Sequence, residues 1–283
     1  MKSKIIRNWV LSAVGILILI MAGYAVYDVL EGKDGKREQA GHQGGHSEMP
    51  GMEHGNKHGE HDGHSSGDLA KSEVKPSVSY KDGVISIQLK DQKGRPFDEL
   101  EVNHEKLMHF ILVSEDLKQY NHLHPQKTSK GSFEVKHRLQ PGTYKAFVDI
   151  KPKNKAYAVA PLKIEAGSHG NHTHQPELKA DTTFSKTIVG HKVSLTPKEF
   201  KAGQPVTLQF SMGDAKPEPY LGARGHVVVL DHTGEKYVHV HPSTPEDTKF
   251  ETEFEEPGLY KLWAEFKING KVITYPFIIG VKK

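Results

Sequence analysis

Three histidines in the last quarter of the chain have a spacing that can bring their side chains to one metal ion. The apolar run after His226 and the segment before His241 alternate in the manner of two β-strands, with a turn over 231–234. A turn centred between positions 232 and 233 places His226 opposite His239, with Cβ atoms about 4.5–5.5 Å apart. His241 shares the face of His239 because strand side chains alternate. The sequence therefore predicts three imidazoles on one face of a hairpin.

The same arrangement occurs 117 positions earlier, at His109, His122 and His124. In both copies twelve residues separate the first two histidines, and a proline follows the third. The agreement continues further along the chain with a gap of one residue. The matching segments are Phe133–Glu134 with Phe250–Glu251, Pro141–Lys145 with Pro257–Lys261, and Phe147 with Trp263. These matches indicate an internal duplication.

The faces of each hairpin differ in character. One face of the later hairpin takes four valines: Val227, Val229, Val238 and Val240. The histidine face is itself partly apolar, through Val228 and Leu230 there and through Ile111 and Val113 in the first copy. An alternative to metal binding is therefore that the histidines are hydrogen-bonded residues at the edge of a half-buried surface.

If the histidines bind metal, two arrangements are open. Each triple can form its own site, or the two triples can face one another across a domain interface. Three nitrogen ligands suit Cu(II), and they suit tetrahedral zinc with a fourth ligand or a water. Met108, directly before His109, offers a thioether close to the first triple.

The composition excludes several classes of protein. The 283 residues carry a net charge of +3 with no basic block, which argues against nucleic-acid binding. Cysteine is absent, so disulfides, thiolate metal sites, thiol catalysis and lipid-modified cysteines are excluded. No phosphate-binding glycine loop or nucleophile elbow is present, and the spacing of His104 and His109 is one residue too long for a zinc-protease helix. We therefore expect no enzymatic activity.

The N-terminus predicts a membrane anchor. Residues 1–8 are basic and are expected in the cytoplasm. Residues 9–30 are expected to span a bilayer once, because the run from Trp9 to Tyr27 is uncharged and close to the required length. The alternative is a cleaved signal peptide with a weak site near Gly23–Ala25. Both interpretations place the domains that follow outside the cytoplasmic membrane.

Residues 31–71 predict a disordered tether, because they are rich in Gly, His, Glu, Ser and Lys and almost free of apolar side chains. Imidazoles suit Cu(II), zinc and nickel, whereas thioethers suit Cu(I), so the mixture of ligands in this segment favours copper. The candidate ligands are His42, His46, Met49, Met52, His54, His58, His61 and His64. We expect weak metal collection there without fixed geometry.

The remainder predicts a mainly β protein with two tandem β-sandwiches of immunoglobulin-like or cupredoxin-like kind. Short strands separated by turns occupy residues 72–166 and again 179–283. A polar linker at 167–178 separates them and carries three further histidines: His169, His172 and His174.

The segment from Pro219 to Pro242, with its paired glycine and histidine and its His-x-His-Pro ending, resembles bacterial extracytoplasmic β-sandwich proteins. It is similar in plan to the YtkA-like and FixH-like domains, and more loosely to the CopC-type copper carriers. In those relatives the position of Arg224 is often methionine, so the resemblance implies a weaker copper site in the second repeat. The resemblance implies metal handling in the cell envelope.

These observations together predict a single-pass membrane protein with extracytoplasmic domains that sequester or deliver copper, with zinc as the second choice. The alternative function is a tandem immunoglobulin-like interaction module of the envelope. In that case the histidines are incidental and a protein partner docks on a sheet face.

Overall fold

The computed structural model describes residues 71–167, 177–213, 215–240, 242 and 244–283. The predicted anchor and the histidines and methionines of the tether lie outside these ranges, as do the three histidines of the linker. The described residues are mainly β and contain no α-helix. Within these ranges, no helix has the length and apolar character needed to cross a membrane. Both repeats belong to a single compact unit of the chain.

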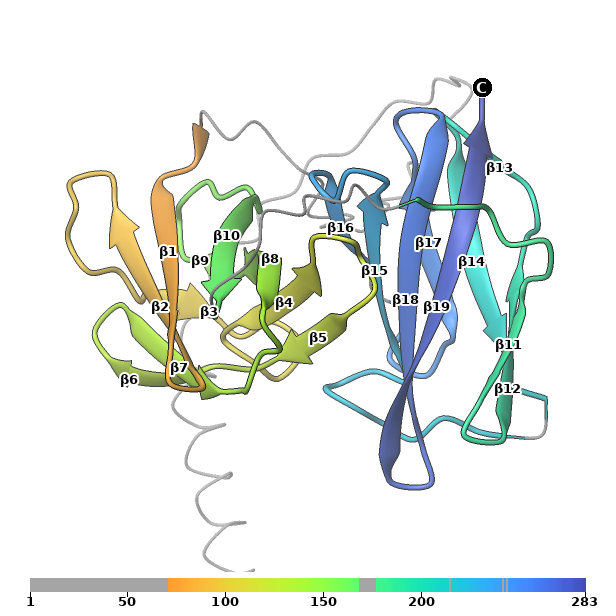
Figure 1. The fold of residues 1–283 in the computed structure, drawn as a ribbon, viewed down its shortest axis with the longest axis horizontal. Coiled ribbons are helices and arrows are strands. Elements are labelled where there is room, and N and C mark those ends of the chain that lie inside the picture. The colour runs from red at the N-terminus through yellow and green to blue at the C-terminus, as the bar shows by residue number, and fades with distance from the viewer. Residues whose placement is uncertain (1–70, 168–176, 214, 241, 243) are drawn as a thin grey trace, which may run out of the picture. The chain divides into compact units, whose positions relative to one another are not determined.

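The first repeat is a sandwich of two four-stranded antiparallel sheets (Figure 1). One sheet has the order β1 (Val74–Lys81), β2 (Val84–Asp91), β7 (Ser132–Lys136) and β6 (Gln126–Ser129). The other has the order β10 (Pro161–Ala166), β8 (Gly142–Asp149), β4 (His109–Ser114) and β5 (Tyr120–Leu123). Two short strands, β3 (Leu100–Glu101) and β9 (Lys151–Pro152), form a separate two-stranded sheet. This strand order is that of immunoglobulin-like sandwiches.

The second repeat is also a two-sheet sandwich, with one sheet of four strands and one of five (Figure 1). Its first sheet has the order β11 (Ser185–Ile188), β12 (His191–Thr196), β14 (Pro205–Ser211) and β17 (Lys249–Glu253). Its second sheet has the order β13 (Phe200–Lys201), β19 (Lys271–Lys282), β18 (Gly258–Ile268), β15 (His226–Asp231) and β16 (Tyr237–Val240). The β13–β19 pair is parallel, and the other strand pairs of these two sheets are antiparallel.

Alternation along the strands produces two apolar faces, as the sequence predicts. Val227, Val229 and Val240 are buried in the core of the second sandwich, and Val238 packs against that core. Val228 and Leu230 point to the opposite face, where they join Ile111 and Val113 of the first repeat in a separate apolar cluster. The histidine-bearing sheets of both repeats are therefore buried on two faces.

The register of the hairpins differs from the prediction by two residues. His239 pairs with Val228 and not with His226, and His122 likewise pairs with Ile111. The cause lies in the turns, where the backbone N–H of Asp231 donates to the carbonyl of Lys236 and so closes a longer loop. The shift is an even number of residues, so it leaves every side chain on its predicted face.

Candidate metal centre

The first repeat gathers three histidines at one end of the β4–β5 hairpin. His109 begins β4, His122 lies in β5 and His124 follows the end of β5. The register pairs Phe110 with Leu123, so that His109 and His124 are level with one another. One ligand nitrogen from each of the three rings lies within 4.8 Å of the others. The ring centroids are 5.1 Å apart for His109 with His122, 5.1 Å for His109 with His124, and 4.7 Å for His122 with His124.

Hydrogen bonds orient these rings towards a common point. The Nε2–H of His109 donates to the carbonyl oxygen of Asn103 at 3.0 Å, which leaves the lone pair on Nδ1. The Nε2 of His122 lies 2.9 Å from that Nδ1, so a single proton lies between two nitrogens that can both bind a metal. On its other side, His122 donates through Nδ1 to Glu265 Oε2 at 2.6 Å. A metal ligand held by a carboxylate in this way is fixed in both tautomer and orientation.

His124 supplies a third nitrogen without a competing bond. Its Nε2 is buried and has no hydrogen-bond partner among the described residues. A buried polar atom without a hydrogen bond costs folding free energy. A metal ion bound to this nitrogen would remove that cost. The three rings therefore offer His109 Nδ1, His122 Nε2 and His124 Nε2 as one ligand set.

Burial keeps His109 and His124 in the neutral state that binds metal. Loss of solvent around His109, reinforced by the charge of His122, lowers the pKa of His109 to about 3. Loss of solvent, again with the charge of His122, lowers the pKa of His124 to about 3. Both rings are neutral at pH 7, and only the neutral ring is a ligand.

The second repeat contributes to the same centre. His226 on β15 and Glu265 on β18 are direct partners in the sheet register, so the two residues lie side by side on neighbouring strands. The ring centroid of His226 lies 5.7 Å from that of His122 and 6.1 Å from that of His109. Its Nε2–H donates to the carbonyl of Tyr220 at 3.0 Å, which repeats the bond from His109 to Asn103. Burial lowers the pKa of His226 well below its usual value.

Glu265 was not among the predicted site residues, and His104 was predicted to lie outside any site. The ring of His104 lies 6.4 Å from that of His109 and 6.1 Å from that of His226, at the margin of the cluster. Glu265 carried a signal that could have identified it. Asp149 stands at the matching position of the first repeat and is the register partner of His109. The duplication therefore repeats a histidine paired with an acid on the neighbouring strand.

The other predicted ligands are placed differently. Met108 is 1% exposed and packs into the core of the first sandwich with Phe110 and Leu112, on the face opposite His109. Its thioether is therefore not brought to the histidines. His241 and the side chain of His239 lie outside the described part of the structure. Arg224, at a position that is often methionine in the proteins that the sequence resembles, donates to the carbonyl of Pro217 at 2.7 Å.

Around the centre, a tyrosine of each repeat stacks on an aromatic side chain of the other repeat. Tyr120 of the first repeat stacks on Trp263 of the second, with centroids 4.9 Å apart. Tyr237 of the second repeat, which matches Tyr120 in the duplication, stacks on Phe147 of the first, also at 4.9 Å. Two equivalent contacts with exchanged roles are the signature of an approximate two-fold axis. The histidine faces of the two repeats thus cover one another.

Polar contacts follow the same interface. The hydroxyl of Tyr237 donates to Asp149 Oδ2 at 3.2 Å. Lys145 of the first repeat forms an ion pair of 2.6 Å with Glu235 in the turn of the second. These bonds fix the orientation of the acid opposite His109 and the position of the β15–β16 turn.

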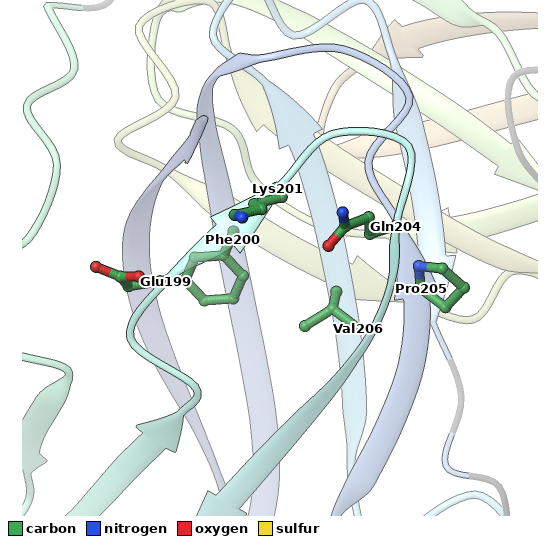
Figure 2. Close-up of a pocket in the computed structure, with 6 residues that line it drawn as sticks. All are labelled: Glu199, Phe200, Lys201, Gln204, Pro205 and Val206. Carbon is green, nitrogen blue, oxygen red and sulfur yellow. The ribbon is translucent and has the colours of Figure 1, made fainter. Parts of the chain in front are cut away.

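A pocket elsewhere in the second repeat offers no comparable chemistry (Figure 2). It has a volume of about 230 Å³. Its lining consists of Glu199, Phe200, Lys201, Gln204, Pro205 and Val206, with no histidine among them. The histidine cluster is therefore the candidate functional site.

Similarity to solved structures is remote. The structure of FdeC, an adhesin of Escherichia coli, matches at 15% identity over 76% of this chain and 66% of that chain, with a TM-score of 0.24. A segment of two fibronectin type-III domains from chicken tenascin matches at 10% identity over 73% of this chain and 97% of that chain, with a TM-score of 0.23. No curated protein matches the chain.

One protein family covers both repeats. The family described as "Domain of unknown function (DUF8832)" matches residues 69–167 and again residues 186–283. The two matches agree with the duplication found in the sequence and together span more than half of the chain. The chain therefore belongs to the DUF8832 family and carries two copies of its domain.

Proposed function

We propose that this protein binds a transition-metal ion at His109, His122 and His124 and sequesters or delivers it in the cell envelope. Copper is the proposed ion and zinc the second choice, and the N-terminal segment is proposed to hold the protein at the membrane. The observation that carries the proposal is the convergence of three imidazole nitrogens within 4.8 Å of one another. No covalent chemistry on a substrate is proposed.

The surroundings of the three rings support this proposal. Asn103 and Glu265 hold His109 and His122 in tautomers that direct one nitrogen of each ring to the shared point. An ion entering there replaces the proton between His109 and His122, so binding is expected to release protons. Nitrogen ligands of this kind suit Cu(II) and zinc. The methionines of the tether, which suit Cu(I), are the reason for placing copper first.

Equilibrium dialysis of the full chain tests the proposal directly. The double variant His122→Ala/His124→Ala is expected to bind one ion fewer than the wild type, because two of three ligands are lost while the tether is kept. Dialysis against Cu(II) and zinc in air and Cu(I) without oxygen, followed by elemental analysis, measures the difference for each ion. The exposed His232→Ala serves as the matched control and should leave the count unchanged. Equal stoichiometry in the wild type and the double variant would refute the site.

Glu265→Gln probes the orientation of His122 while all histidines are retained. The amide has nearly the same shape but no charge, so it holds the Nδ1–H of His122 more weakly. Loss of such a partner is expected to reduce metal affinity by about 10–100-fold. Competition titration with a chromophoric chelator measures the change, and Glu253→Gln, an exposed acid on β17, is the control. An affinity within about two-fold of the wild type would mean that Glu265 does not support the ligand.

A further inference from the structure

We infer that the ion held by the first repeat takes His226 of the second repeat as its fourth ligand, so that a single metal ion joins the two repeats. This inference rests on the proposed metal site at His109, His122 and His124. It adds a closed coordination shell and a link between domains, neither of which follows from three ligands on one hairpin.

The distances between rings support a fourth position at His226. With metal–nitrogen bonds of about 2.1 Å and ring centres about 1.1 Å beyond the nitrogens, four tetrahedral imidazoles have centroids about 5.2 Å apart. The three rings of the first repeat are 4.7–5.1 Å apart. The ring of His226 lies 5.7 Å from that of His122 and 6.1 Å from that of His109, further out than the first three rings are from one another. Its nitrogens are not part of the group that lies within 4.8 Å of one another, so we expect the ring to move inward when the ion binds.

The tautomer of His226 is already set for ligation. Donation from Nε2–H to the carbonyl of Tyr220 places the lone pair on Nδ1, in the same way that Asn103 prepares His109. The side chain is completely buried, so the ring is held among its neighbours and is not free to turn into solvent. Two equivalent backbone carbonyls, one in each repeat, thus prepare two equivalent histidines.

A side chain of the second repeat is already hydrogen-bonded to one of the three histidines of the first repeat. Glu265, the register partner of His226, accepts the 2.6 Å hydrogen bond from His122. A change in the position of β15 or β18 therefore moves both a ligand and the group that orients another ligand. The ion is expected to hold the interface closed, and its release is expected to require that the two repeats separate at this point.

A four-imidazole shell also predicts the character of the site. Closed four-ligand sites hold their metal without an open position for water or substrate, unlike catalytic three-ligand sites. The bound ion would therefore be retained until the interface opens, which is a property suited to storage or hand-over.

X-ray absorption spectroscopy of the full chain tests the inference. The protein is loaded with less than one equivalent of zinc, and separately of Cu(I) without oxygen, so that the tightest site dominates the signal. We expect four imidazoles around zinc in the wild type. In His226→Ala we expect three imidazoles and one oxygen, with an affinity at least about 100-fold lower, by comparison with the effect of losing a supporting residue. His232→Ala, on the turn of the same hairpin, should match the wild type.

The experiment distinguishes failure of the fourth ligand from failure of the proposed three-histidine site. Three imidazoles in the wild type, or unchanged coordination and affinity in His226→Ala, would overturn the inference but leave the three-histidine site intact. Absence of a zinc signal from the folded part of the wild type, with His122→Ala/His124→Ala indistinguishable from it, would instead overturn the proposed function. If His226→Ala fails to fold, His226→Gln fills more of the buried space, and the imidazole count of the wild type still decides between three ligands and four.

Discussion

Lowering the pH from 7 to 5 is expected to destabilise the metal-free protein by about 2 kcal/mol through His109, and by a smaller amount through His124, which is less buried. The pKa of each histidine is about 3 in the folded chain, chiefly because burial removes solvent from the charged form. In the unfolded chain each ring has its ordinary pKa of about 6.5. At pH 5 the unfolded chain is therefore protonated at these rings while the folded chain is not.

The direction of the effect follows from this difference in bound protons. Between pH 6.5 and pH 3 the unfolded state binds more protons than the folded state, so the free energy of unfolding falls as the pH falls. Well above a pH of about 6.5 neither state binds a proton at these positions, so these rings no longer make the free energy of unfolding depend on pH.

Urea unfolding in the presence of a chelator at pH 7, 6 and 5 measures this dependence. The variant His109→Gln should reduce the pH dependence and leave the part due to His124, whereas the exposed His232→Gln should reproduce the profile of the wild type. A wild-type free energy of unfolding that is constant between pH 7 and 5 would show that the rings are solvated or charged in the folded protein.

Replacement of Tyr237 by alanine is expected to cost about 3–5 kcal/mol of stability, the range for truncating a large buried aromatic side chain. The ring is fully buried between the repeats and stacks on Phe147 at 4.9 Å. Its hydroxyl also donates to Asp149, so the variant removes a bond to a buried acid as well as a large apolar volume. The loss should appear in urea unfolding of the metal-free chain.

Two further variants separate the parts of this effect. Tyr237→Phe keeps the stacked ring and should cost about 1–3 kcal/mol, the penalty for leaving a buried polar group without its bond. Val189→Ala, at a side chain that is 73% exposed, should change stability by less than about 0.5 kcal/mol. A cost below about 1 kcal/mol for Tyr237→Ala would mean that the interface does not contribute to folding stability, given the usual cost of such a truncation.

The sequence was sufficient to predict the features that depend on local pattern. Alternation assigned Val227 and Val229 to one face and Val228 to the other, because a strand has a period of two whatever its partner. The duplication was visible in the fixed spacing of the histidines, and the family matches agree with it. The register could not be predicted, because it depends on hydrogen bonds within the turn, such as that from Asp231 to Lys236.

The set of residues that meet at the metal centre could not be predicted from local sequence patterns, because it depends on contacts between distant parts of the chain. His122 and Glu265 are 143 positions apart and meet only because the two sheets pack face to face. The sequence left open whether the two histidine triples lie apart or face one another. The approach of His226 to His109 and His122 favours the second arrangement. Glu265 would have required a comparison of the two repeats for acids as well as for histidines.

The crossed stacking of Tyr120 on Trp263 and of Tyr237 on Phe147 has a consequence for how the protein responds to dilution. Two separate copies of a domain that met through such self-complementary surfaces would dissociate at low concentration. Covalent fusion converts that encounter into an intramolecular one, with an effective concentration on the order of millimolar for domains joined by a short linker. Pairing of the halves is therefore independent of how much protein the cell makes. Fusion also allows the halves to differ in sequence, so that glutamate can occupy position 265 where the first half has aspartate at position 149.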